Sequence, residues 1–166
     1  MPAPRRYIIE LPSEAHTQAL AAALARIAPP GIEIHLAGEL AAGKTAFSRG
    51  FLRALGHQGA VKSPTFTLVE TYAIEPGDGL CTVHHFDLYR LGDPDELHFM
   101  GFEDYRRPEA ICLIEWPSRG GRLLVPSITV ALEITGLDSR RATIEIGAGI
   151  SEERVAEFAT LVANIN

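Results

Sequence analysis

Residues 38–45 read GELAAGKT, which matches the spacing G-x-x-x-x-G-K-[ST] of a phosphate-binding loop. Glycines let such a loop turn several backbone N–H groups inward, and the helix that follows adds unpaired N–H groups and the positive end of its dipole. Lys44 can reach the β- and γ-phosphates of a nucleotide, and the Thr45 hydroxyl can bind Mg²⁺. We therefore predict a nucleotide site whose cofactor-binding residues are Gly38, Ala41, Ala42, Gly43, Lys44, Thr45 and Ala46.

Two carboxylates are placed to work with Mg²⁺ at this loop. A phosphate loop that uses Mg²⁺ needs an acidic side chain for the metal or its waters, usually at the end of a neighbouring buried strand. Asp87 ends the strand-like run 81–87, and Glu115 lies at the end of the more hydrophobic run 110–117. We predict that Glu115 stands on the Mg²⁺ side and that Asp87 orients a water or binds a second metal. Each carboxylate could instead cap a neighbouring helix.

Ser63, Thr65 and Trp116 are further candidates. Ser63 and Thr65 flank Pro64, where P-loop enzymes often place a switch segment that senses the γ-phosphate. The same hydroxyls could equally satisfy the backbone of a proline-containing turn. Trp116 could stack on a base or dock a partner, although a half-buried core position is more usual for tryptophan.

The residue pattern also predicts the elements that position these groups. Strands are expected at 7–11, 32–37, 66–72, 81–87, 110–117, 128–134 and 142–146. Helices are expected after Ser13, from the phosphate loop to Leu55, from Asp93 with Pro94 at the first helical position, and after Ser151. Turn signals at 76–79 and 136–139 predict two antiparallel hairpins. The fold class is therefore α/β, a single P-loop NTPase-like three-layer domain over residues 1–166 with a mixed central sheet and flanking helices.

Composition narrows the classes of function. The net charge of −6 argues against direct binding of nucleic acid, which usually needs a basic face. No signal peptide or apolar run of about 20 residues is found, so a cytoplasmic protein with no membrane segment is expected. Cys81 and Cys112 stand alone in apolar runs and are predicted to be buried free thiols.

Two kinds of site are excluded by residue type and spacing. His84 and His85 are adjacent on a strand and face opposite ways, so they cannot chelate one ion together, and no Cys/His spacing suits zinc. The guanine-reading motif Asn-Lys-x-Asp is impossible, because the only asparagines are Asn164 and Asn166. ATP is therefore favoured over GTP.

Four motifs occur in a fixed order: the phosphate loop, SPTFT at 63–67, HFDLYR at 85–90 and LIEWP at 113–117. With these motifs, residues 38 to 120 resemble the bacterial TsaE family, formerly YjeE, a P-loop ATPase of the machinery that makes N6-threonylcarbamoyladenosine in tRNA. The resemblance implies a cytoplasmic ATPase, weak alone, that acts with the partners TsaD and TsaB. ATP hydrolysis would reset the TsaB–TsaD complex between rounds of threonylcarbamoyl transfer, and tRNA would be reached only through that complex.

The resemblance also implies a role for each matching residue. The catalytic residues would be Lys44, Asp87 and Glu115; Thr45 and Glu115 would bind Mg²⁺; Ser63, Thr65 and Trp116 would be the switch and partner-sensing residues; and Arg140 would lie near the nucleotide. The family usually has Gly-Ala-Gly-Lys-Thr-Thr in its loop, where this chain has Ala41 and Ala46 at the first and last of those positions. If the backbone at Ala41 needs a positive φ, alanine costs about 1 kcal/mol there.

Two alternatives stay open at this point. A small-molecule P-loop kinase has the same size and loop, and Arg106, Arg107, Arg119 and Arg122 could form its phosphate-clamping lid or a solvated surface. An ATP-gated interaction module without significant turnover is the other alternative. Ala41 and Ala46 suggest this alternative, because both differ from the usual family loop and Ala46 lacks the hydroxyl of the usual threonine next to the phosphates.

Overall fold

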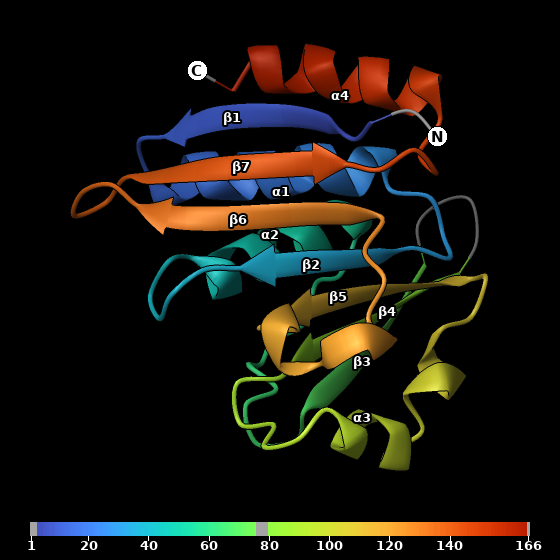
Figure 1. Cartoon of the computed structure of the whole chain (residues 1–166). Helices are drawn as coiled ribbons and strands as arrows, with labels where there is room; N and C mark the ends of the chain where they lie inside the picture. The colour runs from blue at the N-terminus through green and yellow to red at the C-terminus, as the bar shows by residue number, and fades with distance from the viewer. Residues whose placement is uncertain (1–2, 76–79, 166) are drawn as a thin grey trace.

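Strands from most of the chain hydrogen-bond into one sheet, as the computed structural model shows for residues 3–75 and 80–165 (Figure 1). The strands are β1 (Arg5–Leu11), β2 (Glu33–Ala37), β3 (Val69–Ile74), β4 (Cys81–Asp87), β5 (Ala110–Glu115), β6 (Ile128–Ile134) and β7 (Arg140–Ile146). Their order across the sheet is β1-β7-β6-β2-β5-β4-β3. The helices are α1 (Glu14–Ile27), α2 (Lys44–Leu55), α3 (Asp95–Phe99) and α4 (Glu152–Ala163), with short 3₁₀ turns η1 (Phe102–Tyr105), η2 (Pro117–Arg119) and η3 (Gly121–Leu123).

The middle of the sheet is parallel. β2 pairs with β5 on one side and β6 on the other, and β5 pairs in turn with β4. Parallel strands are normally covered on both faces and read as continuous apolar runs. β5 follows this rule, since every one of its residues is buried. The parallel direction also brings the carboxyl ends of β2, β4 and β5 to one edge, where Asp87 pairs in register with Glu115.

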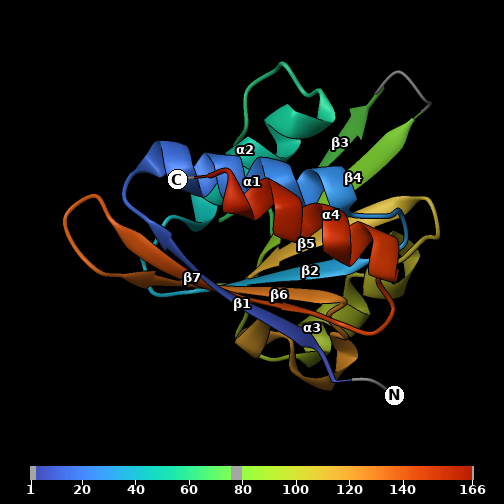
Figure 2. The same cartoon turned by 90° about the horizontal axis from the view of Figure 1, so that it is seen from above.

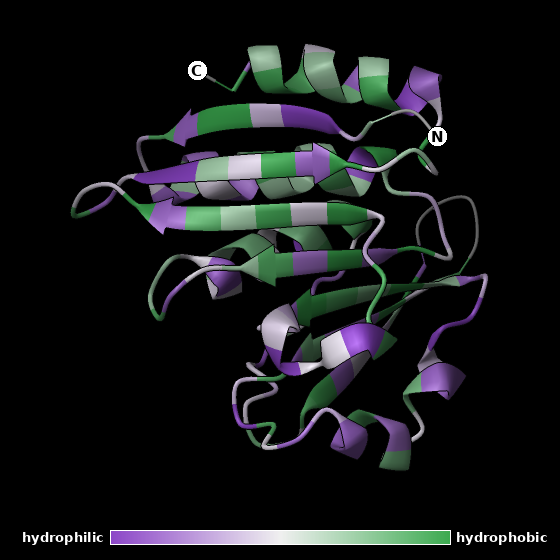
Figure 3. Ribbon diagram, viewed as in Figure 1, coloured by the Kyte–Doolittle hydropathy of each residue, from purple (hydrophilic) through white to green (hydrophobic). Residues whose placement is uncertain are grey.

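The outer strands β1, β7 and β6 are antiparallel and have one solvated face. Along β7, Ile144 and Ile146 are buried while Glu145 between them is exposed. Figure 3 shows this contrast, with green along β5 and green mixed with purple along β7. The alternation of hydrophobic and polar residues therefore determines which half of the sheet is covered on both faces.

Helices cover the sheet from both sides, as Figure 2 shows for α1, α2 and α4 on one face and α3 on the other. Leu20, Leu24 and Ile27 of α1 are fully buried in the larger core, and their spacing is that of one helix face. A Cβ on Gly50 of α2 would lie 2.9 Å from Cα of Gln18, so glycine allows α1 and α2 to pack backbone to backbone. The second core is formed by Phe86, Leu88, Leu91, Leu97, Phe102, Cys112, Ile114 and Leu124. The predicted three-layer α/β fold is confirmed.

One predicted strand is wrong at its start. The segment 66–72 was expected to be extended, yet β3 begins only at Val69. Leu68 N donates to Pro64 O at 2.8 Å, and Leu68 has a φ of +66°, so residues 64–68 form a turn. Local hydrogen bonding after Pro64 overrides the strand propensity of Phe66 and Thr67. The predicted hairpin is confirmed by the antiparallel pairing of β3 and β4, while the turn signal at 76–79 lies outside the described residues.

Several other boundaries, among them those of α3, β5 and β7, differ from the sequence-based expectation by one or two residues. α3 begins at Asp95 rather than Pro94, although Asp93 Oδ1 still accepts from Asp95 N at 2.9 Å as a cap would. β5 ends at Glu115, because Trp116 has a φ of +58°. β7 begins at Arg140 instead of residue 142.

Two further sequence-based expectations concern thiols and membranes. Cys81 and Cys112 are free thiols, as predicted, with Cys112 buried and Cys81 partly exposed. Burial raises the pKa of the Cys112 thiol to about 12. Within residues 3–75 and 80–165, no helix combines the length and the apolar character needed to cross a membrane.

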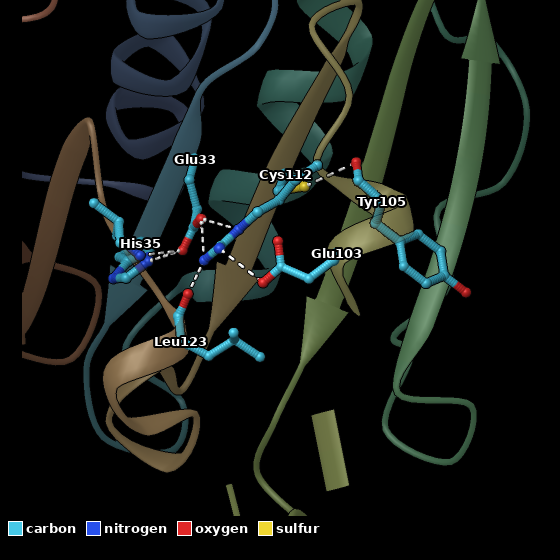
Figure 4. A network of polar contacts seen from close by, with 8 residues as sticks. Glu33, His35, Glu103, Tyr105, Cys112 and Leu123 are labelled. Atoms are coloured by element: carbon cyan, nitrogen blue, oxygen red, sulfur yellow. Dashed lines mark hydrogen bonds and ion pairs between the residues drawn. The ribbon is translucent and has the colours of Figure 1, made fainter. Parts of the chain in front are cut away.

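A buried polar network fixes the amino end of β2 (Figure 4). Glu33 is 6% exposed, and its Oε1 accepts from His35 Nε2 at 2.7 Å and from Val125 N at 3.0 Å. Its Oε2 accepts from Arg106 Nε at 3.2 Å, and Arg106 also donates to the carbonyl oxygen of Leu123. One carboxylate therefore connects β2 with the segments before β5 and before β6.

We predict that Glu33→Gln lowers the free energy of unfolding by about 1–3 kcal/mol, because an amide NH₂ would face other donors and the charge opposite Arg106 would be lost. Urea denaturation followed by circular dichroism measures the change. Glu145→Gln, on the solvated face of β7, is the matched control and should stay within about 0.5 kcal/mol of the parent chain. Equal stability of the two variants would contradict this account.

Candidate functional site

The phosphate loop joins the carboxyl end of β2 to α2. Gly38 has a φ of +155°, and a Cβ there would lie 2.8 Å from the carbonyl oxygen of Leu132, so only glycine fits. Gly43 has a φ of +106° and precedes α2, which begins at Lys44. The N–H groups of the first helical turn have no partner within the helix and point toward the loop. Both glycines therefore have backbone conformations that other residues rarely adopt, and the loop leads directly into the amino end of α2.

Lys44 is nearly buried beside this loop, with 6% of its surface exposed. Its Nζ donates to the carbonyl oxygens of Gly38 at 2.5 Å and Glu39 at 2.8 Å, and lies 4.3 Å from the centre of the Trp116 ring. Burial lowers the pKa of Lys44, while the charges of Glu115 and Asp87 oppose the shift. The ammonium is thus held by two backbone carbonyls and an aromatic face, and it experiences the charges of the two carboxylates.

Asp87 and Glu115 lie side by side at the ends of β4 and β5, 7% and 3% exposed. Asp87 Oδ1 accepts from Tyr89 N at 3.0 Å, and Glu115 Oε2 accepts from His85 Nε2 at 2.6 Å. Neither hydrogen bond comes from the N-terminal N–H of a helix, because the donors are a turn amide and an imidazole. These contacts are therefore not helix caps. Burial raises the pKa of Asp87, the neighbouring Glu115 raises it further, and the Tyr89 N–H acts against both.

A cavity of about 430 Å³ unites these groups. Its lining comes from α1, the phosphate loop, the start of α2, the segment 63–65, the ends of β4 and β5, and the β6–β7 turn. Of the predicted site residues, it is lined by Ala41, Gly43, Lys44, Thr45, Ala46, Ser63, Thr65, Asp87, Glu115, Trp116 and Arg140. Gly38 and Ala42 do not line it: Gly38 packs on β6, and the Ala42 side chain is buried in the larger core.

The segment around Pro64 contacts Asp87. Ser63 Oγ and Thr65 Oγ1 are 2.7 Å apart, and Thr65 Oγ1 donates to Asp87 Oδ2 at 3.4 Å. Both hydroxyls therefore bond to side chains of the site. Their predicted role as a γ-phosphate switch stays a prediction.

Trp116 is half-buried, as the sequence suggested, and it also lines the cavity. Its ring contacts the Tyr89 ring at a centroid distance of 4.9 Å and packs against the second core. A positive φ at this residue turns the chain sharply after Glu115. The tryptophan ring is thereby placed against the Lys44 ammonium.

Arg140 braces the phosphate loop from the first residue of β7. Its guanidinium donates to the carbonyl oxygens of Ala41 at 3.0 Å and Ala42 at 3.1 Å, and also to those of Gly136 and Ser139 in the β6–β7 turn. The sequence suggested a place near the nucleotide, and Arg140 does line the cavity. The hydrogen bonds show that it also fixes the loop backbone at the point where Ala41 replaces the usual glycine.

Several cavity residues were not predicted. Glu14 and Thr17 of α1, Tyr89 after β4, and Leu137 and Asp138 of the β6–β7 turn also form the lining. No local motif marks them, because they reach the site only through the packing of α1 and the hairpin. His85 is also part of the surroundings of the site, and its position two residues before Asp87 on β4 places both side chains on the same face of the strand.

The arginines proposed for a kinase lid do not gather over this cavity. Arg106 is bound to Glu33 at the amino end of β2, the end away from the cavity. Arg107 Nε donates to the carbonyl oxygen of Asp104. Arg119 lies nearer, with its guanidinium 5.8 Å from the centre of the Tyr89 ring. The set therefore does not form one clamp.

The model of the family described as "Threonylcarbamoyl adenosine biosynthesis protein TsaE" matches residues 11–144. The chain belongs to the TsaE family. The resemblance that its motifs indicated is confirmed.

The sequence matches between this TsaE-family chain and its relatives cover different shares of its length. A Haemophilus influenzae protein is 49% identical over 110 residues, 66% of each chain, and a Bacillus subtilis protein is 40% identical over 100 residues, 60% of each. The match therefore spans less than two thirds of the length of these two relatives. A Rickettsia felis protein is 37% identical over 150 residues, 89% of this chain and 84% of its own. All three are named tRNA threonylcarbamoyladenosine biosynthesis protein TsaE.

The fold is also that of a solved structure. The crystal structure of Bacillus subtilis YdiB superposes with a TM-score of 0.74 at 25% identity, covering 100% of both chains. The similarity thus extends to the parts of this TsaE-family chain outside the matched motifs.

Ala41 has a φ of +67°, so the strain expected from the sequence is present in the loop. The Ala41→Gly substitution removes backbone strain of about 1 kcal/mol from the folded state. The greater conformational freedom of glycine in the unfolded chain partly offsets this gain in stability. We predict that the variant is up to about 1 kcal/mol more stable. Ala46→Gly, in the first turn of α2, is the matched control and should be about 0.5–1 kcal/mol less stable. Thermal and urea unfolding measure both; a destabilised Ala41→Gly chain would contradict the strain argument.

The raised pKa of Asp87 makes stability depend on pH. Since this carboxyl has a higher pKa in the folded protein than in the unfolded chain, its deprotonation costs the folded state more. The free energy of unfolding should therefore fall as pH rises from the ordinary aspartate pKa through the raised value. Asp87→Asn should flatten this fall and be more stable than the parent chain at pH 7. Urea titrations at pH 4 to 7 measure the profile, with exposed Asp138→Asn as control; a profile unchanged by Asp87→Asn would refute the assignment.

Proposed function

We propose that this TsaE-family protein binds Mg-ATP and hydrolyses it slowly alone, as the ATPase of a complex with TsaB and TsaD. The observation that carries the proposal is the convergence of the phosphate loop, Lys44 and two nearly buried carboxylates on one cavity. Family membership supports the place in threonylcarbamoyladenosine biosynthesis. The net charge of −6 fits a protein that reaches tRNA only through its partners, and we propose that it acts in the cytoplasm.

The residues of the cavity have the right chemistry for this role. N–H groups of the first turn of α2 and the Lys44 ammonium would bind the β- and γ-phosphates. The Thr45 hydroxyl and Glu115 offer hard oxygen ligands of the kind that Mg²⁺ prefers and would hold the ion beside the phosphates. When bound, Mg²⁺ neutralises charge on the phosphates during transfer.

Asp87 would orient the attacking water. Its Oδ2 contacts Thr65 and its Oδ1 is fixed by the Tyr89 amide, so the carboxylate has a defined orientation beside Glu115. The raised pKa of Asp87 also makes it a better proton acceptor than an exposed aspartate. In this scheme Glu115 serves the metal and Asp87 serves the water.

The test is ATP hydrolysis by the purified chain, alone and with TsaB and TsaD. We expect slow turnover alone and stimulation by the two partners together. Lys44→Ala should lower the partner-stimulated hydrolysis rate by at least about 100-fold, because it removes the cation at the phosphates. Lys62→Ala is the matched control, since Lys62 is the other lysine of the chain and lies outside the cavity lining.

Two results would overturn the proposal in favour of the alternatives. Full hydrolysis without partners, together with ATP-dependent phosphorylation of a nucleoside or sugar, would indicate a kinase. ATP binding with no turnover in any mixture would indicate an interaction module gated by the nucleotide.

A further inference from the structure

His85 is buried against the metal-side carboxylate. It lies on β4 two residues before Asp87, on the same face of the strand, and is 1% exposed. Its Nε2 is 2.6 Å from Oε2 of Glu115 on the neighbouring strand β5. This contact is the shortest polar contact that Glu115 makes with the described residues, and it involves no atom of the phosphate loop.

The other ring nitrogen determines which proton His85 carries. Nδ1 is buried and has no hydrogen-bond partner among the described residues. A proton on Nδ1 would be an unsatisfied buried donor, which costs about 1–3 kcal/mol. A proton on Nε2 instead donates directly into the carboxylate. The surroundings therefore favour a proton on Nε2, where it has an acceptor.

This hydrogen bond restricts Glu115. A glutamate at a strand end has several rotamers, and a carboxylate near other charges can turn either oxygen toward them. With Oε2 held by His85 inside the protein, the remaining oxygen Oε1 is the one left for the cavity that Glu115 lines. In metal sites, hydrogen bonds from behind the ligand fix its orientation in this way.

We propose that His85 is a positioning residue for Mg²⁺ binding: its Nε2–H holds Oε2 of Glu115 so that Oε1 faces the metal. The inference rests on the proposed function, because it requires Mg²⁺ to bind beside Glu115 with the nucleotide. It adds a residue that neither the loop motif nor the carboxylates themselves identify.

His84 offers a matched control. It is the adjacent residue on β4, is 9% exposed, and faces the other side of the sheet. Its Nδ1 is 2.8 Å from Thr71 Oγ1, and its ring packs edge-on against Tyr105. A substitution here removes a buried histidine of the same strand without touching Glu115, so it measures the effect of packing alone.

The experiment measures how nucleotide binding and hydrolysis depend on Mg²⁺ concentration. Trp116 is the sole tryptophan and lines the cavity, so its fluorescence can follow ATP binding without turnover. His85→Leu should raise the Mg²⁺ concentration for half-maximal binding by about 10-fold to 100-fold. ATP binding measured without Mg²⁺ should not change. His85→Gln, whose amide can donate from nearly the place of Nε2, should recover most of the Mg²⁺ affinity, and His84→Leu should retain it.

A double-mutant cycle isolates the pathway through Glu115. In a Glu115→Gln background, His85→Leu should have no further effect on the Mg²⁺ dependence, because the oriented carboxylate is already gone. An undiminished effect in that background would overturn the proposal, as would a His85→Leu chain with the parent's Mg²⁺ dependence.

Further outcomes test this proposal and separate it from the proposed function. Should His85→Leu fail to fold, ¹⁵N NMR of the parent chain is decisive: a protonated Nε2 on His85 supports the proposal, and an Nε2 without a proton overturns it. If the parent chain binds ATP without any dependence on Mg²⁺, the metal part of the proposed function fails and this inference fails with it. A normal Mg²⁺ dependence that no His85 variant shifts would overturn the positioning role alone.

Discussion

Parallel pairing of β2, β5 and β4 is the constraint on which the rest of the site depends. It aligns Leu36 with Glu115 and Glu115 with Asp87, so the phosphate loop that follows β2 begins beside both carboxylates. The connection from β4 to its parallel neighbour β5 contains α3, α2 lies between β2 and β3, and these two helices cover opposite faces of the sheet. The covering helices make the strand ends a largely buried place. There, charges interact strongly with one another.

The burial of charge at this edge has an energetic cost that the surrounding contacts only partly offset. Lys44 and Asp87 have pKa values displaced toward their neutral forms, with burial as the largest cause in each. The backbone carbonyls around Lys44, the amide of Tyr89 and the imidazole of His85 supply the compensating hydrogen bonds. Such clusters usually occur where binding or catalysis requires them, because structure alone rarely favours them.

The two ends of β2 have different roles in the structure. At its amino end, Glu33 joins three segments through satisfied hydrogen bonds, which suits a structural role. At its carboxyl end the loop has a strained Ala41, and Arg140 holds the carbonyl oxygens of Ala41 and Ala42 from a different part of the sheet. The TsaE-family loop of this chain thus tolerates alanine at a position that favours glycine, with support from a distant hairpin.

The sequence by itself determined the loop, the strands that end in Asp87 and Glu115, and the layered α/β fold, because glycine positions and apolar runs act through local backbone requirements and burial. Only the tertiary structure decided that His85 supports Glu115 and that Arg106 binds Glu33 far from the cavity. Those contacts depend on strand register and on segments distant in the chain, which no local pattern encodes. The turn before β3 belongs to the same class, since a hydrogen bond from Asp87 N to the carbonyl oxygen of Leu68 connects it to β4. Residue types therefore indicated the chemistry, and packing selected the partners.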